Sequence, residues 1–178
     1  EDIIISFSED EKGNLWIVTQ NKGFDYMIVN EGKFIHMANM LPPDYKIQED
    51  QIFFIHQDKQ NNLWIGTEGK IHYFEISYNE TGVPKLQPIK IENQILSTAA
   101  LSIEEDKDGN IWIGTPGEGL LQFDYKDKIL RKFKLSDNSS SFNSLVILSL
   151  KADEIGNLWV GGFPREDNPD SEIGTSPG

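Results

Sequence analysis

The sequence predicts an all-β protein made of β-propeller blades, and three observations support that fold class. A ten-residue pattern, DKDGNIWIGT at 106–115, occurs in four similar copies, and all four tryptophans lie in these copies. The tryptophans are regularly spaced by 48, 48 and 47 residues, at Trp16, Trp64, Trp112 and Trp159. Each repeat contains short β-rich runs separated by turn residues, and no stretch has a sustained 3.6-residue apolar period. We therefore expect four-stranded antiparallel meanders of about 47–48 residues and very little helix.

Each copy opens with a turn of the form Asp-x-x-Gly-Asn. Asp in the first turn position accepts hydrogen bonds from backbone N–H groups, and Gly in the fourth position adopts a positive φ. Asn61 replaces the Gly in the second copy, and Asn tolerates the left-handed region better than most residues. We interpret the aspartates as turn caps, because four equivalent positions cannot converge on one ligand atom. The repeated positions are Asp10, Gly13, Trp16, Asp58, Trp64, Asp106, Gly109, Trp112, Asp153, Gly156 and Trp159.

The strand after each turn is apolar on both sides. Leu or Ile residues point one way and Trp points the other, so the strand needs a sheet on each side. Radially stacked four-stranded sheets meet that need, and they place each Trp between neighbouring blades. A β-sandwich also has many short strands, but it does not require a strict 48-residue period. The propeller is therefore the favoured architecture.

The predicted elements follow the repeat along the chain. A propeller fragment spans residues 1–162 as three blades and part of a fourth, and its end blades expose apolar faces. The tail 163–178 is rich in Pro, Gly, Asp and Ser and is expected to be disordered or a loop. The repeats cover about 3–40, 51–92, 99–136 and 143–162. The expected strands are 3–8, 15–19, 24–29 and 33–37, then 52–56, 63–67, 71–77 and 86–91, then the run 99–106, 110–115, 120–125 and 129–135, with two strands in the fourth copy.

Composition excludes several classes of partner. The chain has 29 acidic and 16 basic residues and a net charge of −13, which disfavours nucleic acid and anionic lipid surfaces. It contains no Cys, so no thiolate binds a metal or attacks a substrate. No apolar run reaches the roughly 20 residues of a membrane helix. This segment is not expected to bind a membrane directly.

The residues with catalytic or metal-binding chemistry have structural explanations. His36, His56 and His72 alternate with apolar neighbours, as structural histidines in strands do. Glu104 and Glu105 are adjacent in a strand and point to opposite faces, so they cannot flank one glycosidic bond. The turn after Asp106 lacks the Gly and Glu positions of a calcium loop. We therefore expect no catalytic residues, no metal and no cofactor.

The loops that vary between copies are the place where a ligand is expected. In a propeller, the loops between second and third strands share one face with the loops between blades, and variation on a repeated scaffold favours specificity there. An aromatic ring flanked by polar side chains would suit a sugar. The alternative is that these are solvated loops in a chain whose pocket uses other blades. The candidate ligand-binding residues are Gln20, Lys22, Tyr45, Glu68 and Glu118.

The repeat resembles the two-component regulator propeller repeat over residues 3 to about 162. The departures are Asn61 for Gly, Val18 for the Gly before Thr, and the ending Val-Gly-Gly at 160–162. The resemblance implies seven-bladed propellers in the periplasmic sensor region of Bacteroides-type hybrid two-component receptors. It also implies a histidine kinase elsewhere in the full-length receptor.

The resulting prediction is a non-catalytic ligand-sensing segment that recognises an oligosaccharide or a similar product of polymer breakdown. Its expected macromolecular partners are the remaining blades of the same receptor or a second copy of the chain. Two alternatives stay open. One is a protein-docking or structural propeller, and the other is a propeller polysaccharide lyase or glycosidase, which would need converging acids or a His/Tyr set.

Overall fold

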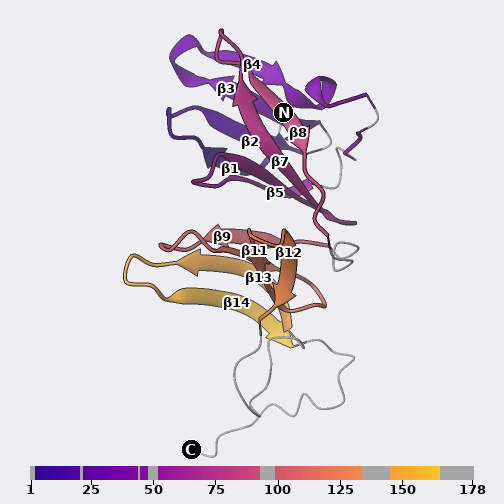
Figure 1. The fold of residues 1–178 in the computed structure, drawn as a ribbon, viewed down its shortest axis with the longest axis vertical. Coiled ribbons are helices and arrows are strands. Elements are labelled where there is room, and N and C mark those ends of the chain that lie inside the picture. The colour runs from indigo at the N-terminus through magenta and orange to yellow at the C-terminus, as the bar shows by residue number, and fades with distance from the viewer. Residues whose placement is uncertain are drawn as a thin grey trace, which may run out of the picture.

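The computed structural model describes residues 3–20, 22–43, 45–47, 52–92, 99–133 and 145–164. Within these ranges the chain forms three four-stranded antiparallel sheets and one two-stranded hairpin, each built from consecutive strands. Figure 1 shows the sheets following one another from the indigo N-terminal sheet to the yellow hairpin. This arrangement confirms the predicted meanders and the partial propeller of three blades plus part of a fourth.

The strand boundaries follow the repeat. The first sheet contains β1 (Ile4–Glu9), β2 (Leu15–Thr19), β3 (Gly23–Ile28) and β4 (Lys33–His36). The second contains β5 (Ile52–Gln57), β6 (Asn62–Thr67), β7 (Ile71–Tyr78) and β8 (Pro84–Pro88). The third contains β9 (Ser102–Glu105), β10 (Ile111–Gly114), β11 (Leu120–Asp124) and β12 (Ile129–Lys132), and the hairpin is β13 (Leu145–Ala152) with β14 (Leu158–Pro164). The helices are two short 3-10 turns, η1 (Val29–Glu31) and η2 (Met37–Met40), which confirms the low helix content among the described residues.

Several strand boundaries differ from the prediction; for example, β9 covers Ser102–Glu105 and not the expected run 99–106. Strand β8 covers Pro84–Pro88 and not 86–91, because the chain crosses to the third sheet, where the Glu92 N–H donates to the Lys128 carbonyl at 2.9 Å. Strand β14 continues to Pro164, two residues past the predicted limit, because Pro164 still pairs with Leu145. Residues 163 and 164 of the predicted tail 163–178 are therefore strand and not loop. The rest of that tail and the expected strand end at 134–135 lie outside the described residues.

The turn chemistry is confirmed in all four copies. Asp10 Oδ1 accepts hydrogen bonds from the N–H groups of Lys12 and Asn14, both at 2.8 Å, and the second and third copies repeat this pattern. In the fourth copy Asp153 Oδ1 accepts from the N–H groups of Gly156 and Asn157. Asn61 has a φ of 64°, like the glycines that occupy its position in the other turns. The aspartates therefore act as caps that fix the approach to each second strand.

Successive sheets pack against each other with the same pair of faces at each junction. We call the side of a sheet that carries the repeated Trp its Trp face and the opposite side its aliphatic face. Trp16 packs with the aliphatic face of β6, and Trp64 packs with the aliphatic face of β10. Trp112 packs with the hairpin, beside Leu158 and Val160. The predicted wedge is thus confirmed for three tryptophans, whereas Trp159 is 65% exposed because no described sheet covers it.

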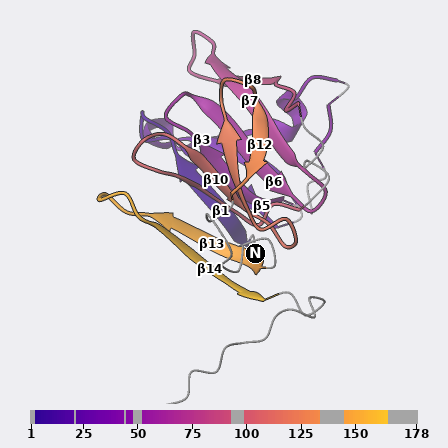
Figure 2. The same cartoon turned by 60° about the horizontal axis from the view of Figure 1, so that its bottom comes forward.

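Gly114 of the WIG segment permits close approach of the third sheet and the hairpin. A Cβ on Gly114 would lie 2.6 Å from Ile147 Cγ2 and 2.9 Å from the Ile147 carbonyl. The Ile147 N–H also donates to the Thr115 carbonyl at 2.9 Å, so β13 lies directly on the end of β10. Figure 2 shows the β13–β14 hairpin as a separate outer layer.

Candidate ligand-binding face

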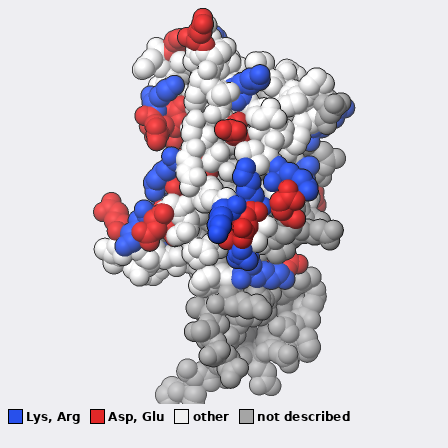
Figure 3. Space-filling model, viewed as in Figure 1, with Lys and Arg blue, Asp and Glu red and all other residues white. Residues whose placement is uncertain are grey.

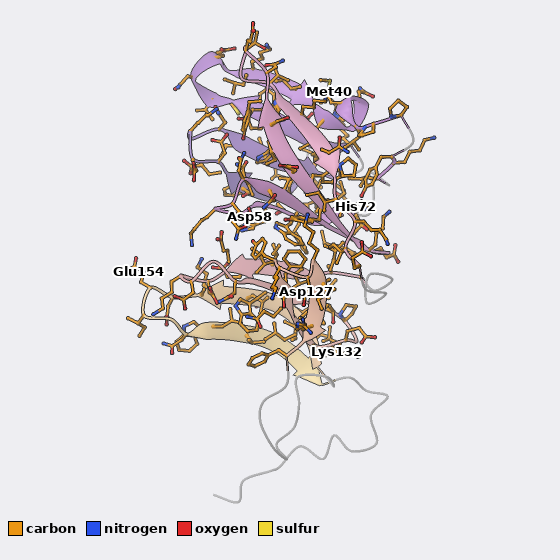
Figure 4. All side chains as sticks on the ribbon, in the orientation of Figure 1. Met40, Asp58, His72, Asp127, Lys132 and Glu154 are labelled. Atoms are coloured by element: carbon orange, nitrogen blue, oxygen red, sulfur yellow. The ribbon has the colours of Figure 1, made fainter. Side chains whose placement is uncertain are left out.

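The two ends of the blades carry different loops, as predicted. At one end, the β1–β2 and β3–β4 turns meet, because the Val29 N–H donates to Asn14 Oδ1 at 3.2 Å. At the other end, the β6–β7 turn meets the segment 41–47 between the first and second sheets, because Lys70 Nζ lies 5.4 Å from the Tyr45 ring centroid. We call these the turn face and the loop face. Figure 4 shows Asp58 and Glu154 on the turn face, with Met40 and His72 on the loop-face side.

The aspartates of the turn face are fully engaged by the protein. Asp58 is buried, and its Oδ2 accepts hydrogen bonds from Trp64 Nε1 at 2.8 Å and from the Tyr125 hydroxyl at 3.0 Å. Asp10 Oδ2 accepts from the Tyr26 hydroxyl at 2.6 Å. Trp16 Nε1 consequently donates elsewhere, to Gln57 Oε1 at 2.6 Å. These carboxylates therefore have structural partners that explain their positions.

The protonation behaviour of Asp10 agrees with a structural role. Burial alone would raise its pKa, but the hydrogen bonds from the Tyr26 hydroxyl and from the Asn14 and Lys12 amides outweigh burial and lower it. The pKa of Tyr26 is raised by burial and then by its bond to Asp10. The pair therefore consists of a carboxylate and a neutral phenol at neutral pH, and neither group is suited to act as an acid or base there.

A pocket of about 400 Å³ opens on the loop face beside the second sheet. It combines two aromatic rings, two lysine ammonium groups and an apolar floor. Tyr73, which belongs to this lining, stacks on Trp64 with centroids 4.2 Å apart. The pocket is lined by Tyr45, Lys70, Ile71, Tyr73, Pro88, Ile89, Lys90 and Ile91.

The Tyr45 ring is held in place by His72 and Phe74 of β7. The Tyr45 hydroxyl lies 2.8 Å from His72 Nδ1, and the Tyr45 ring meets the Phe74 ring edge-on at 5.2 Å. Burial, with a contribution from Lys70, lowers the pKa of His72 to about 3, and burial raises the pKa of Tyr45 to about 12. Both groups are neutral at neutral pH. Their contact fixes the ring orientation, which supports a structural role for His72.

The other two histidines lie elsewhere. His36 Nδ1 is 2.9 Å from Asp25 Oδ1 at the surface of the first sheet. His56 Nε2 lies 3.9 Å from Glu105 Oε2 of the third sheet and has no hydrogen-bond partner. Glu104 and Glu105 diverge as predicted, since Glu104 bonds Lys151 and Glu105 bonds the Lys59 N–H. The two glutamates do not form a catalytic pair.

The structure separates the five candidate residues. Tyr45 lines the pocket, and Glu68 is exposed in the β6–β7 turn two residues before Lys70. Gln20 and Lys22 belong to the β2–β3 turn of the first sheet, and Glu118 forms an ion pair with Lys132 of the third sheet. These three residues therefore sit on sheets other than the one that forms the pocket.

Three residues that line the pocket were not predicted from the sequence, namely Lys70, Tyr73 and Lys90. Lys70 was detectable, because it immediately follows the Glu68-Gly69 loop. Tyr73 pairs with Trp64 across β6 and β7, and it was detectable only as a core strand residue. Lys90 lines the pocket because β8 ends at Pro88, earlier than predicted.

On the face shown in Figure 3, acidic and basic side chains are interspersed.

Three exposed apolar residues occupy equivalent positions in the first strands of three repeats. Ile5, Phe53 and Leu148 are exposed and lie where bulges interrupt the register of β1, β5 and β13. The first strands of neighbouring sheets are adjacent, because Ser6 Oγ accepts from the Ile55 N–H at 3.3 Å. In these three strands the bulge turns one residue away from both packed faces.

Metal and membrane features are absent from the described part of the chain. Among the residues that the structure describes, no group of three or more His, Asp or Glu side chains is placed to hold a metal ion. In the same ranges no helix is both long enough and apolar enough to cross a membrane.

Comparison with protein families identifies the repeat. Residues 46–69 and 94–117 match the family described as two component regulator propeller. The chain therefore carries repeats of this kind, which confirms the resemblance drawn from the Asp-to-Trp motif. A comparison with curated proteins gives no significant match.

Comparison with solved structures shows the propeller fold. The extracellular domain of the hybrid two-component system protein BT4673 from B. thetaiotaomicron aligns with a TM-score of 0.62 and 22% identity, over 89% of this chain and 20% of that chain. PorZ of Porphyromonas gingivalis, a surface component of the type-IX secretion system, gives 0.65 and 12%, over 89% and 24%. Virginiamycin B lyase from Staphylococcus aureus gives 0.57 and 15%, over 88% and 48%. The chain thus spans about a fifth of the length of the BT4673 domain.

Proposed function

We propose that this chain is part of a non-catalytic, extracytoplasmic sensor propeller and that it binds an oligosaccharide in the pocket beside Tyr45. The two-component regulator propeller repeats support the sensor assignment, and the fold shared with an extracellular domain of a hybrid two-component system supports the location. The kinase and the membrane-crossing part of such a receptor would lie outside these repeats. A periplasmic position follows from the same proposal.

The observation that carries the proposal is the orientation of the Tyr45 ring at the pocket. Sugars present C–H faces that pack on aromatic rings, and a ring fixed in advance loses little conformational entropy on binding. The hydrogen bond to His72 and the edge-on contact with Phe74 supply that fixation. The volume of about 400 Å³ lies within the range typical of small-molecule pockets.

The charge at the pocket favours an acidic oligosaccharide. Lys70 and Lys90 line the pocket of a chain whose net charge is −13, so they form a local positive site. Lys90 Nζ pairs with Glu92 Oε2 at 2.9 Å, but both side chains are well exposed, and such surface pairs exchange readily. A uronic acid or sulfated sugar would supply the carboxylate or sulfate that these ammonium groups can bind.

The position of Tyr45 gives a route from binding to signalling. Tyr45 belongs to the segment between the first and second sheets, whereas the opposite wall of the pocket comes from the second sheet and the chain leaving it. A ligand that contacts both walls would favour one arrangement of this segment. Signalling then requires that the ligand bind the two states of the receptor with different affinities.

A structural or protein-docking role is the second candidate, and one observation favours it. Phe7 on the first sheet and Trp159 on the hairpin are 67% and 65% exposed, so both ends of the row of sheets present apolar faces. The propeller lyase among the similar structures shares only the fold. The proposed function includes no catalytic step.

A thermal-shift screen tests the proposal. The probes are trigalacturonate as an acidic trisaccharide and maltotriose as a neutral one, with wild-type protein, Tyr45→Ala, and Tyr26→Phe as a control at the turn face of the first sheet. The expected result is a raised midpoint with trigalacturonate for wild type and Tyr26→Phe, and none for Tyr45→Ala. No shift with either sugar for any variant would reject binding at this pocket and favour the docking role.

A further inference from the structure

We propose that Lys70 selects the charge of the ligand at the Tyr45 pocket, and that the Thr67 hydroxyl is the positioning group that holds Lys70 in place. This inference rests on the proposed function, because it concerns the same pocket. It assigns the preference for an acidic sugar to one of the two pocket lysines and to the turn between β6 and β7 that carries it.

The two lysines of the pocket differ in their partners. Lys90 Nζ lies 2.9 Å from Glu92 Oε2, so part of its charge is compensated before a ligand arrives. Lys70 Nζ lies over the Tyr45 ring, 5.4 Å from the ring centroid. Within the part of the chain that the structure describes, no Asp or Glu side chain forms an ion pair with Lys70. The charge of Lys70 is therefore the less compensated of the two.

The charge of Lys70 also acts on the wall of the pocket. After burial, Lys70 is the second cause of the lowered pKa of His72. His72 Nδ1 lies 2.8 Å from the Tyr45 hydroxyl, so Lys70 is close to the pair of groups that fixes the Tyr45 ring. A carboxylate that pairs with the Lys70 ammonium would therefore lie beside the ring on which a sugar packs.

The Thr67 hydroxyl closes the turn that carries Lys70. Thr67 Oγ1 donates to the Lys70 carbonyl at 2.9 Å and accepts from the Lys70 N–H at 3.2 Å. The Thr67 N–H donates to the same carbonyl at 3.0 Å. Thr67 is buried, and only Glu68 and Gly69 lie between the two residues. Both backbone groups of Lys70 are thus held by one residue that is shielded from water.

The hydroxyl is needed because the Thr67 carbonyl has another partner. In a two-residue turn, the carbonyl of the first residue commonly accepts from the N–H of the fourth. The Thr67 carbonyl instead accepts from the Ala100 N–H, on the approach to the third sheet, at 3.3 Å. The hydroxyl therefore replaces the carbonyl as the acceptor for the Lys70 N–H, and the carbonyl helps to join the second sheet to the third.

The neighbouring sheets give an internal comparison. In the third sheet, Thr115 Oγ1 donates to the Gly119 carbonyl and accepts from the Glu118 N–H, both at 2.9 Å, and the Thr115 carbonyl again bonds the next sheet. In the first sheet, the Thr19 carbonyl itself accepts from the Lys22 N–H at 3.3 Å. Thr19 Oγ1 is buried and has no hydrogen-bond partner among the described residues. The hydroxyl therefore serves the turn when the carbonyl serves the next sheet.

The residue held by this hydroxyl differs between sheets. It is Lys70 in the second sheet, whereas in the third sheet it is Glu118, which forms an ion pair with Lys132. The same backbone arrangement thus presents a different charge at each blade. A side chain that varies on a repeated scaffold is suited to set specificity.

Isothermal titration calorimetry with trigalacturonate tests the role of Lys70. Lys70→Met removes the ammonium group, keeps a long apolar side chain, and is expected to weaken binding by about tenfold. Lys90→Met is expected to weaken it by only about threefold, because Lys90 already shares its charge with Glu92. Added salt should weaken binding to wild type more than binding to Lys70→Met. Equal losses for the two lysine variants would overturn the assignment to Lys70.

Three threonine variants test the positioning role. Thr67→Val keeps the side-chain shape without the hydroxyl and is expected to weaken binding by about fivefold, whereas Thr67→Ser should bind like wild type. Thr115→Val is the matched control, since it removes the equivalent hydroxyl of the third sheet. It should lower the thermal midpoint about as much as Thr67→Val and leave the affinity unchanged. Circular dichroism checks that each variant is folded at the titration temperature.

The outcomes separate this inference from the proposed function. Wild-type affinity in Thr67→Val, or an equal loss of affinity in Thr67→Val and Thr115→Val, would overturn the positioning role. Binding to wild type that is unchanged in Lys70→Met would overturn this inference and leave the proposed function standing. Absence of binding to the wild-type chain would reject both.

Discussion

Tyr125 of the third sheet donates a hydrogen bond of 3.0 Å to Asp58 Oδ2 of the second sheet. The same oxygen accepts from Trp64 Nε1 at 2.8 Å. The residue that caps one turn thus also orients the Trp of its own blade and joins that blade to the next. Burial, followed by the charge of Asp58, raises the pKa of Tyr125, so its hydroxyl remains a donor.

Removing the Asp58 carboxylate is expected to destabilise the folded chain. Asp58→Ala leaves buried donors of Asn62, Trp64 and Tyr125 without an acceptor and should lower the free energy of unfolding by about 3 kcal/mol. Asp153→Ala removes the equivalent cap at an exposed turn and should cause a smaller decrease. Urea denaturation measures both. Equal losses for the two variants would show that Asp58 acts only as a local cap.

Replacing a tryptophan should lower the free energy of unfolding by an amount that depends on how far that tryptophan is buried. Trp64→Ala should lower the free energy of unfolding by about 3–5 kcal/mol, because Trp64 is fully buried between the second and third sheets. Trp159→Ala should lower the free energy of unfolding by less than about 1 kcal/mol, because Trp159 is 65% exposed. Chemical denaturation compares them. A large loss for Trp159→Ala would contradict the open hairpin face.

Small substitutions test the close approach in the WIG segment. Gly66→Ala places a methyl group against the Phe54 ring and should lower the free energy of unfolding by about 1–3 kcal/mol. Gly69→Ala is the control, since a Cβ there meets no atom within 4 Å and the backbone φ lies outside the left-handed region. The thermal midpoint reports both. A neutral Gly66→Ala would mean that the Phe54 ring moves aside freely.

His72 should make stability fall as the pH is lowered. Its pKa is lowered from 6.5 to about 3 by burial, with a contribution from Lys70, so the unfolded chain binds a proton in a range where the folded chain does not. The free energy of unfolding should therefore decrease as the pH falls from about 7 to 5. This window lies above the range of the carboxylates with lowered pKa, Asp10, Glu105 and Asp106.

Two variants isolate this effect. His72→Phe should flatten the pH dependence between pH 7 and 5, whereas Tyr45→Phe keeps the buried imidazole and should retain the dependence. Urea unfolding at several pH values is the measurement. An unchanged slope in His72→Phe would assign the acid sensitivity to other groups.

The features that could be predicted from the sequence depend on local interactions and recur in the repeats. The Asp caps, the positive φ of Asn61 and the burial of Trp16 all follow from turn chemistry and from strand alternation, which four copies display in register. The local sequence pattern could not predict the hydrogen bond from Tyr125 to Asp58. The residues at the equivalent positions of the first two repeats are Val29 and Ile76, so the repeat pattern does not predict a tyrosine there.

The candidate site was predicted only in part for a related reason. Tyr45 was identified from its loop, and its ring does line a pocket. Three of the four residues expected with it, Gln20, Lys22 and Glu118, were taken from equivalent loops of other blades, which the radial arrangement keeps on separate sheets. Lys90 and Tyr73 come from where β8 ends and from the pairing of β6 with β7, both of which require the three-dimensional structure.

Backbone hydrogen exchange with and without trigalacturonate tests the ligand site most directly. We predict added protection at residues 67–71 and 89–91 on the loop face, including the Ile89 N–H that donates to the Tyr73 carbonyl, and no change at residues 58–62 of the turn face. Protection confined to the turn face, or no change at any amide at saturating sugar, would contradict it.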